Sequence, residues 1–496
     1  MLQTLSRNKE RTIVFFLLGI YLLYAFLWQD VLFYDESYYL DRGSQVSTSM
    51  FFHHLTDGPL YSLWFKVLSF LCPNPEGRYF LSWGLLVTLV ATIPWLARIR
   101  SAWIYALVLL CIPFFNVGPY VSLFASMFFV IGLCLILRLE LTVVDALVLS
   151  CVLCFLVAFC RPEFEYGVFI AGAASVVAIL ARGFKESKTR AIASLLLVGG
   201  LVGSMVAVVK HSEQSRSGLA FVQHYNLRAS QKGLLGGESA PLSLYAYKVF
   251  HVAPRSGATM GEFFRANPRL FLGHVLDNAM DPKFFLALAA LVAVTAYLWL
   301  IVKEGSLISA SVFVVVISIP VAIGSLLVYP RRHYSVIAVP TVLLFAIQVI
   351  KPERWMRKVS VPLVLLGATA LIVARPLLKH QIPNHHPGLL SVRCLRDLDA
   401  SEAGRSSTMF DSIGIPNVYL ISPKVQGSIF YISDLQGFER WTRETKPDWI
   451  VTGPDMALQY HMTAAELDEL IQSEFRYVPH ACPTTTGLTV YTAPAR

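Results

Sequence analysis

Long apolar runs separated by short polar segments dominate the first 378 residues. A helix needs about 20 mostly apolar residues to cross a bilayer. Eleven runs approach that length, at about 12–33, 79–97, 102–117, 119–137, 142–160, 164–181, 190–209, 283–302, 306–328, 334–350 and 359–378. Residues 102–137 are either two spans broken at Asn116–Pro119 or one re-entrant pair. The pattern predicts a polytopic α-helical membrane protein with about 11 transmembrane helices.

The polar segments between the runs predict the orientation. Basic residues precede the first run and recur in every second short segment, at Arg98, Arg138, Arg182, Lys303 and Lys351. Because Lys and Arg gather in cytoplasmic loops, the N-terminus is expected in the cytoplasm. The long segments then lie outside: loop 34–78, loop 210–282 and the tail 379–496. We therefore expect a multi-pass protein of the bacterial inner membrane with a periplasmic C-terminal domain.

Composition narrows the class of protein. The 496 residues are 55% hydrophobic and only 15% charged, whereas globular domains carry about 25% charged residues. This excludes a soluble enzyme, a disordered chain and a coiled coil. The formal net charge of +9 is mostly accounted for by the inside loops, so no nucleic-acid partner is expected. No Walker motif or Gly-rich phosphate loop is found, so chemistry with a soluble nucleotide is not expected.

The tail is predicted to form a small α/β domain over 379–496. A polar linker at 376–387 precedes it, and short apolar runs at 417–422, 428–433, 448–452 and 487–492 predict strands. Thr463 and Glu466 form a capping box that opens a helix to about Ser473. Cys394 and Cys482 either form a disulfide in the oxidising periplasm or are two unrelated buried thiols.

Both outer loops contain amphipathic stretches. In loop 210–282, Thr259 and Glu262 form a second capping box before an apolar stripe that reaches Leu276, interrupted at Asn267–Pro268. In loop 34–78, apolar residues over 55–71 lie near one face. These stretches are either interfacial helices that handle a lipid or helices that cover the rim of the bundle.

Acidic residues at the start of the first outer loop are candidates for catalysis. Asp35 and Glu36 directly follow the first apolar run, where unpaired carboxylates are costly. They could act as a general base on an acceptor hydroxyl or form a solvated helix N-terminus. Asp57 heads a later turn, and Tyr38 and His54 lie nearby in sequence. These three are the candidates for orienting a substrate.

Basic residues in short outer loops are the second group of candidates. Arg161 lies between the fifth and sixth spans if 102–137 is counted as two. Arg331, Arg332 and His333 lie between the ninth and tenth. Because cations are disfavoured in short outer loops, these residues either bind phosphate or pair with nearby acids and headgroups. No cluster with the ligand spacing of a zinc site is present.

Four motifs resemble one enzyme group, the GT-C superfamily of polyprenyl-phosphate-sugar-dependent glycosyltransferases. They are Tyr34–Tyr39, Asp57–Lys66, Arg161–Glu163 and Tyr329–Pro340. The sequence is most similar to the protein mannosyltransferase-like (glycosyltransferase family 39) and lipid A aminoarabinose transferase-like branches. Asp57–Gly58 departs from the more usual His-Pro or Lys-Pro before Pro-Leu. The layout implies a GT-C-like transmembrane domain over 1–378.

The resemblance implies a reaction and its partners. Asp35, with Glu36, would deprotonate an acceptor hydroxyl, which would attack the donor sugar with inversion. Arg161, Arg331, Arg332 and His333 would stabilise the departing polyprenyl phosphate, and Asp57, Tyr38 and His54 would orient the substrates. The partners would be the lipid-linked donor, a glycan, lipid or protein acceptor, and membrane lipids. No cofactor is specified, although some members use a divalent metal ion.

Other functions are compatible with parts of this pattern. A flippase for a lipid-linked glycan would carry charges within its spans and often inverted halves, and neither is seen here. A non-catalytic scaffold would leave the outer acids and arginines without a role. An O-antigen polymerase or ligase would also use Arg331, Arg332 and His333.

Overall fold

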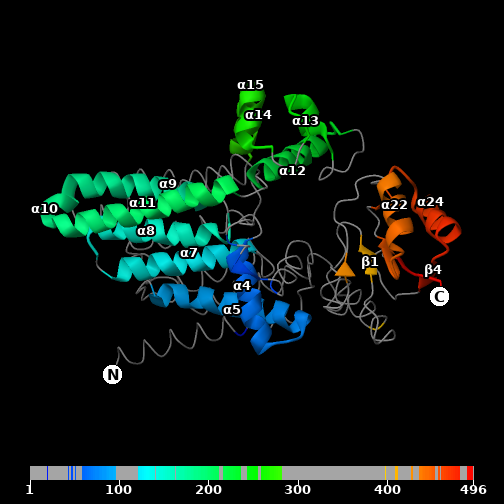
Figure 1. Ribbon diagram of the computed structural model, residues 1–496, viewed down its shortest axis with the longest axis horizontal. Helices are drawn as coiled ribbons and strands as arrows, with labels where there is room; N and C mark the ends of the chain where they lie inside the picture. Colours follow the sequence, from blue (N-terminus) through cyan, green and yellow to red (C-terminus); the bar gives the residue numbers. More distant parts are fainter. Residues whose placement is uncertain are drawn as a thin grey trace, which may run out of the picture.

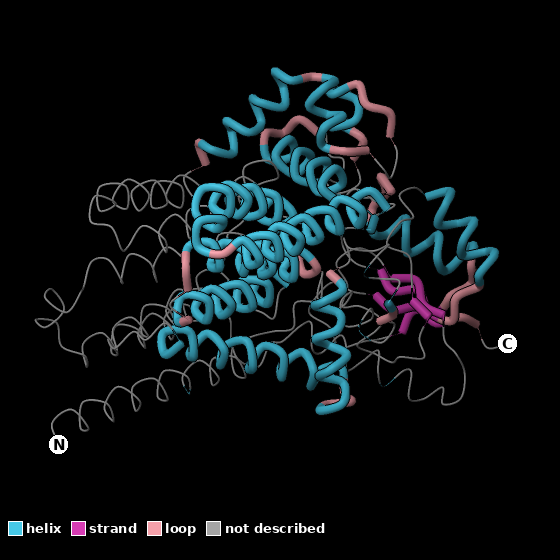
Figure 2. The backbone as a smooth tube through the Cα atoms, turned by 60° about the vertical axis from the view of Figure 1, so that its left-hand side comes forward, coloured by secondary structure: helices cyan, strands magenta, loops and turns pink. Residues whose placement is uncertain are grey.

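The computed structural model describes three groups of elements (Figures 1 and 2). The described residues are 58–96, 121–139, 141–161, 164–211, 216–235, 243–254, 258–281, 408–411, 426–427, 435–452, 456–457, 460–480 and 489–494, with single positions at 19, 43, 46–48, 51 and 397. The predicted spans at 12–33, 102–117 and 283–378 lie outside these residues, as do Cys394 and Cys482.

The first group is a bundle of apolar helices that run alongside one another (Figure 1). Its members are α5 (Pro75–Leu96), α7 (Val121–Arg138), α8 (Val143–Ala158), α9 (Phe164–Ala178) and α11 (Lys188–His211). A π-helical turn, Ile179–Gly183, carries α9 into α10 (Phe184–Glu186). Five of the apolar runs are thus confirmed as helices with edges within a few residues of the prediction.

Two stretches of this bundle are long and apolar enough to cross a bilayer. Among the described residues these are Phe164–Glu186 and Lys188–Val209. Many of their apolar side chains, such as Val177 and Leu196, are exposed on the outside of the bundle. Gly172 lets α9 approach α11 closely, since a Cβ there would lie 2.8 Å from a methyl of Val202. Transmembrane insertion of all eleven runs stays a prediction.

Basic residues cluster at one end of the bundle. Arg138 ends α7, Lys185 lies in α10 and Lys188 begins α11. Arg190 pairs with Asp145, and the hydroxyl of Thr142 accepts a hydrogen bond from the backbone N–H of Asp145 to cap α8. This is the end that the sequence assigns to the cytoplasm.

Helix α4 (Pro59–Leu71) lies at the opposite end and runs across the bundle in both views (Figures 1 and 2). Gly58 begins it in the left-handed region (φ 59°), a conformation that glycine adopts without steric cost. Tyr61, Phe65 and Leu68 are buried against the bundle. The indole N–H of Trp64 donates to the Ser82 hydroxyl at 2.8 Å and ties α4 to α5.

The second group is a helical unit formed by loop 210–282. It comprises α12 (Arg216–Gln231), α13 (Tyr245–Phe250), α14 (Met260–Ala266) and α15 (Pro268–Ala279). Its own core is built largely from buried aromatic side chains: Phe221, Phe250, Phe263 and Phe271. Several apolar residues that the sequence assigned to a single interfacial stripe are therefore inside a protein core.

The two predicted N-terminal features of this unit behave differently. The Thr259 side chain does not cap α14, because the Glu262 N–H donates instead to the Thr259 carbonyl at 3.0 Å. The interruption at Asn267–Pro268 is confirmed. Asn267 caps α15 by accepting from the Leu270 N–H at 3.0 Å, with Pro268 in the first turn.

The third group is a five-stranded mixed sheet in the tail. Its strands are β1 (Thr408–Asp411), β2 (Gln426–Gly427), β3 (Trp449–Thr452), β4 (Val478–His480) and β5 (Thr489–Thr492), in the order β2-β1-β3-β5-β4. β1 pairs in parallel with β2 and β3, and β5 pairs antiparallel with β3 and β4. The strands predicted at 448–452 and 487–492 are confirmed.

Helices pack against this sheet around a core that includes Phe438, Ile450, Leu467 and Ile471. They are α22 (Leu435–Thr445) and α24 (Ala464–Glu469), which continues through a π turn to Glu474. The Thr463–Glu466 capping box is confirmed with both reciprocal bonds. The sequence analysis did not predict β1, β2, β4 or α22, and the predicted strands at 417–422 and 428–433 lie outside the described residues.

Candidate functional site

Most of the predicted site residues lie outside the described part of the chain. These are Asp35, Glu36, Tyr38, His54, Asp57, Arg331, Arg332 and His333. Their roles stay predictions. Arg161 is described, as is Gly58, which directly follows Asp57. The site is therefore built upward from these two positions.

Arg161 lies in a tight turn between α8 and α9. Its N–H donates to the Val157 carbonyl at 3.0 Å, and its carbonyl accepts from the Phe164 N–H at 3.1 Å. The residue is 6% exposed. Because a buried charge is costly unless polar groups surround it, the buried Arg161 marks a polar position at the end of an apolar bundle.

The beginning of α4 contacts this turn through the main chain. The Leu60 N–H donates to the Phe159 carbonyl at 3.1 Å. The Phe51 ring lies 5.7 Å from the Phe159 ring. The structure thus brings the segment that directly follows Asp57 to the turn that carries Arg161.

Another described position of the first outer loop packs on α4 itself. A Cβ at Gly43 would lie 3.0 Å from the Phe65 Cβ and 3.1 Å from the Ser62 carbonyl oxygen. The loop backbone therefore closely approaches the helix there. Positions 43, 51 and 58 place parts of loop 34–78 against α4 and the α8–α9 turn.

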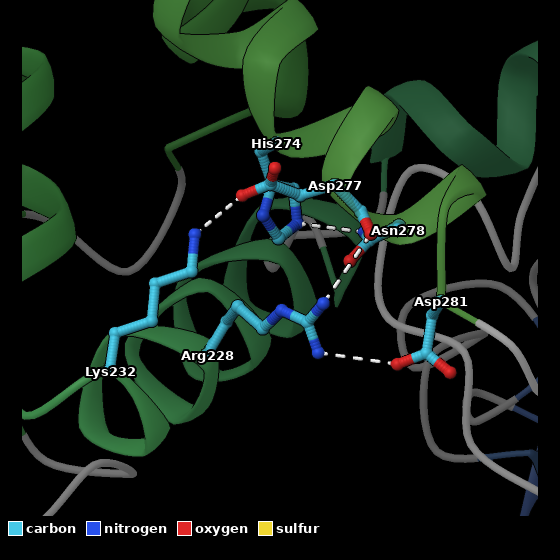
Figure 3. Close-up of polar contacts among 6 residues, drawn as sticks. All are labelled: Arg228, Lys232, His274, Asp277, Asn278 and Asp281. Atoms are coloured by element: carbon cyan, nitrogen blue, oxygen red, sulfur yellow. Dashed lines mark hydrogen bonds and ion pairs between the residues drawn. The ribbon is translucent and has the colours of Figure 1, made fainter.

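A second polar cluster joins α12 to α15 (Figure 3). Arg228 pairs with Asp281 at 3.2 Å, and Lys232 pairs with Asp277 at 2.5 Å. Within α15, the Asn278 amide nitrogen lies 3.1 Å from His274 Nε2. His274 and Asn278 are both buried. The sequence analysis missed this cluster, although Arg228/Lys232, Asp277/Asp281 and His274/Asn278 share the i, i+4 spacing of one helix face.

Aromatic rings surround the buried end of this cluster. The His274 ring lies 5.4 Å from Phe221 and 5.2 Å from Tyr225. Burial, followed by the neighbouring Tyr245 and Asp277, raises the pKa of Tyr225 to about 12. Tyr225 therefore keeps its proton at neutral pH. With two ion pairs and an aromatic core around it, the cluster can fasten α15 to α12.

Neither potential metal ligands nor similarity to known proteins adds to the assignment of this site. Within the described ranges, no group of three or more His, Cys, Asp or Glu residues is arranged to hold a metal ion. Scans against protein-family models and against curated proteins return no match for this chain.

Proposed function

We propose that the protein is a membrane glycosyltransferase of the GT-C type. It moves a sugar from a polyprenyl-phosphate donor to an acceptor hydroxyl, with inversion, at the outer face of a bacterial inner membrane. The observation that carries this proposal is the Leu60–Phe159 main-chain bond. This bond joins the segment following Asp57 to the turn of Arg161, at the end of the bundle opposite its basic loops.

The proposed chemistry divides between acids and cations. Asp35, with Glu36, takes the proton of the acceptor hydroxyl as the oxygen attacks C1 of the sugar from the face opposite the phosphate. The C1–O bond to polyprenyl phosphate breaks, and its electron pair leaves with the phosphate. Positioned proton transfer of this kind is worth about 10²–10⁴ in rate.

The burial of Arg161 supports its assignment to the cationic residues of the proposed reaction. A fixed cation in a site with little water stabilises developing negative charge more than a solvated one does. Arg161 is held by main-chain bonds in a short turn and is almost completely buried. In this proposal its guanidinium stabilises the charge that develops on the leaving phosphate, together with Arg331, Arg332 and His333.

The proposal is tested by measuring release of polyprenyl phosphate from purified protein in nanodiscs. A panel of polyprenyl-phosphate sugars serves as donors and an envelope extract supplies acceptors. We expect Asp35→Asn to lower release by at least about a hundredfold. Asp145→Asn is the matched control, because Asp145 pairs with Arg190 at the opposite end of the bundle. It should leave release unchanged.

Other outcomes separate the alternatives. Equal release by wild type and Asp35→Asn would remove Asp35 as the base and point to Glu36 or Asp57. Donor translocation without release, measured in proteoliposomes with an accessible-donor assay, would overturn the transferase in favour of a flippase.

A further inference from the structure

Two helices from distant parts of the sequence lie across the bundle direction at the same end. Helices α4 and α15 both have this orientation in Figure 1, on opposite sides of the bundle, at the end where α11 gives way to α12. α4 is fastened there by the Leu60–Phe159 bond. The bundle helices are the most apolar elements, so any bilayer around them would have its surface near this end.

α15 exposes several apolar side chains beside charged ones. Its buried face holds Phe271 with the polar residues His274 and Asn278, and Leu270 and Val275 pack partly buried against the same core. Its exposed residues include Leu272, Leu276 and Met280, spaced four residues apart, together with the charged Arg269 and Asp277. Leu276 is 65% and Met280 74% exposed. A helix that faces only water exposes mostly polar residues, so these three exposed apolar side chains suit contact with an apolar medium.

α4 exposes apolar residues at its C-terminal end. Val67, Phe70 and Leu71 are exposed, Phe70 to 78%. Tyr61, Phe65 and Leu68 on the other face are buried against the bundle. Exposed apolar side chains on α11, including Val206 and Val209, lie at the same end of the bundle.

We propose that the α15 stripe (Leu272, Leu276, Met280) and the α4 tip (Val67, Phe70, Leu71) insert side-on into the outer leaflet of the bilayer. This inference rests on the proposed function, which places this end of the bundle outside. Helices in the plane of a membrane bury their apolar face at the boundary of headgroups and acyl chains. The exposed Arg265 and Arg269 precede the stripe and suit anionic headgroups.

A lipid surface fits these patches better than a second copy of the chain does. The helices that carry these patches, α15 and α4, lie on opposite sides of the bundle (Figure 1), so one flat protein partner would not reach both helices. A bilayer that surrounds the bundle reaches both at one depth. The proposal therefore requires that both patches meet acyl chains at similar depth.

The test measures depth with a fluorescent amino acid introduced by amber suppression at one position in each variant. The positions are Leu276, Phe70 and, as matched control, Val478. Val478 is also apolar and exposed (55%) but lies on strand β4 of the tail. Full-length protein is placed in nanodiscs of phosphatidylethanolamine and phosphatidylglycerol containing lipids with a nitroxide quencher at defined acyl positions.

We expect acyl-chain nitroxides to quench positions 276 and 70 at least threefold more than position 478, with the same preferred depth. Iodide in the buffer should quench them correspondingly less. Iodide quenching at 276 equal to that at 478 would overturn the proposal. Shielding from both quenchers would also overturn it, in favour of a protein partner.

Release of polyprenyl phosphate is measured on the same labelled proteins. Release with iodide-accessible labels would overturn the lipid contact but keep the transferase. Quenching by lipid without release would keep the lipid contact and count against the transferase.

Discussion

Helices α15 and α22 have similar length but differ in the side chains that they expose and bury. α22 buries Phe438 and Thr442 against the tail sheet and exposes polar residues such as Gln436 and Arg440. α15 buries His274 and Asn278 beside Phe271, and it exposes Leu272, Leu276 and Met280 beside the charged Arg269 and Asp277. α22 follows the ordinary rule for a helix between a protein core and water. α15 departs from it at Leu272, Leu276 and Met280, which would follow it only in an apolar medium.

The comparison shows that apolar residues on a helix do not reveal by themselves which face is the inner one. In α22, the less polar face of the helix is the buried face. In α15, contacts identify the polar residues of the buried face, because His274 contacts Asn278 and its ring lies beside those of Phe221 and Tyr225. The two regions should therefore respond independently to damage in their cores, and differently to damage at their surfaces.

The largest effects should come from deleting one buried ring in each core. Phe221 and Phe438 are both fully buried. Phe→Ala at either position should lower the local free energy of unfolding by about 3–5 kcal/mol. Hydrogen exchange of the full-length protein should then accelerate by about 10² or more, in α12–α15 for Phe221→Ala and in the tail for Phe438→Ala. Acceleration of both regions in either variant would show that the cores are coupled.

Ion pairs in the two regions should differ in strength. Asp281 is almost buried where it pairs with Arg228, whereas Arg443 and Glu474 are both more than half exposed. We expect Asp281→Asn to destabilise the α12–α15 unit by about 1–3 kcal/mol. Glu474→Gln should change the stability of the tail by about 0–1 kcal/mol. Local hydrogen exchange measures both, and equal effects would contradict the difference in burial.

Two glycines within the helical unit should give effects of opposite sign. A Cβ at Gly218 would lie 1.8 Å from the Ala258 carbonyl oxygen, whereas a Cβ at Gly273 would meet nothing within 4 Å. Gly218→Ala should therefore destabilise the unit by about 1–3 kcal/mol. Gly273→Ala should stabilise α15 by about 0.5–1 kcal/mol. Thermal unfolding in nanodiscs, followed by exchange of α12 and α15, tests the sign of each.

The smallest expected effect is the loss of stability when the threonine of each predicted capping box is replaced, and it should differ between the two boxes. Thr463→Ala should cost the tail about 1 kcal/mol, because its hydroxyl accepts from the Glu466 N–H at 3.2 Å. Thr259→Ala should cost much less, because the Thr259 side chain makes no capping bond. A comparable loss of helix protection in both variants would mean that the second box forms in solution.

Periodicity and capping signals predicted the elements whose causes are local. The apolar helices of the bundle, the break at Asn267–Pro268 and the Thr463 cap all follow from residues near in sequence. The buried face of α15 could not be predicted this way, because it depends on Phe221, Tyr225 and Arg228 in a helix some fifty residues earlier. β4 was missed since all three of its residues are exposed and give no alternation.

The candidate site likewise has parts that the sequence predicts and parts that it does not. Arg161 was identified from its unusual place in a short outer loop, and the structure adds that it is buried in a tight turn. The approach of α4 to that turn has no signature in sequence, because the Leu60–Phe159 bond uses main-chain atoms only. Side-chain patterns carry no information about such a bond.

The main-chain character of that bond also determines which sequence changes it tolerates. Any residue except proline supplies the N–H at position 60, and every residue supplies the carbonyl at position 159. Side chains at both positions can diverge during evolution while the join between α4 and the α8–α9 turn persists. A proline scan, rather than an alanine scan, is therefore the mutagenesis that reveals this connection.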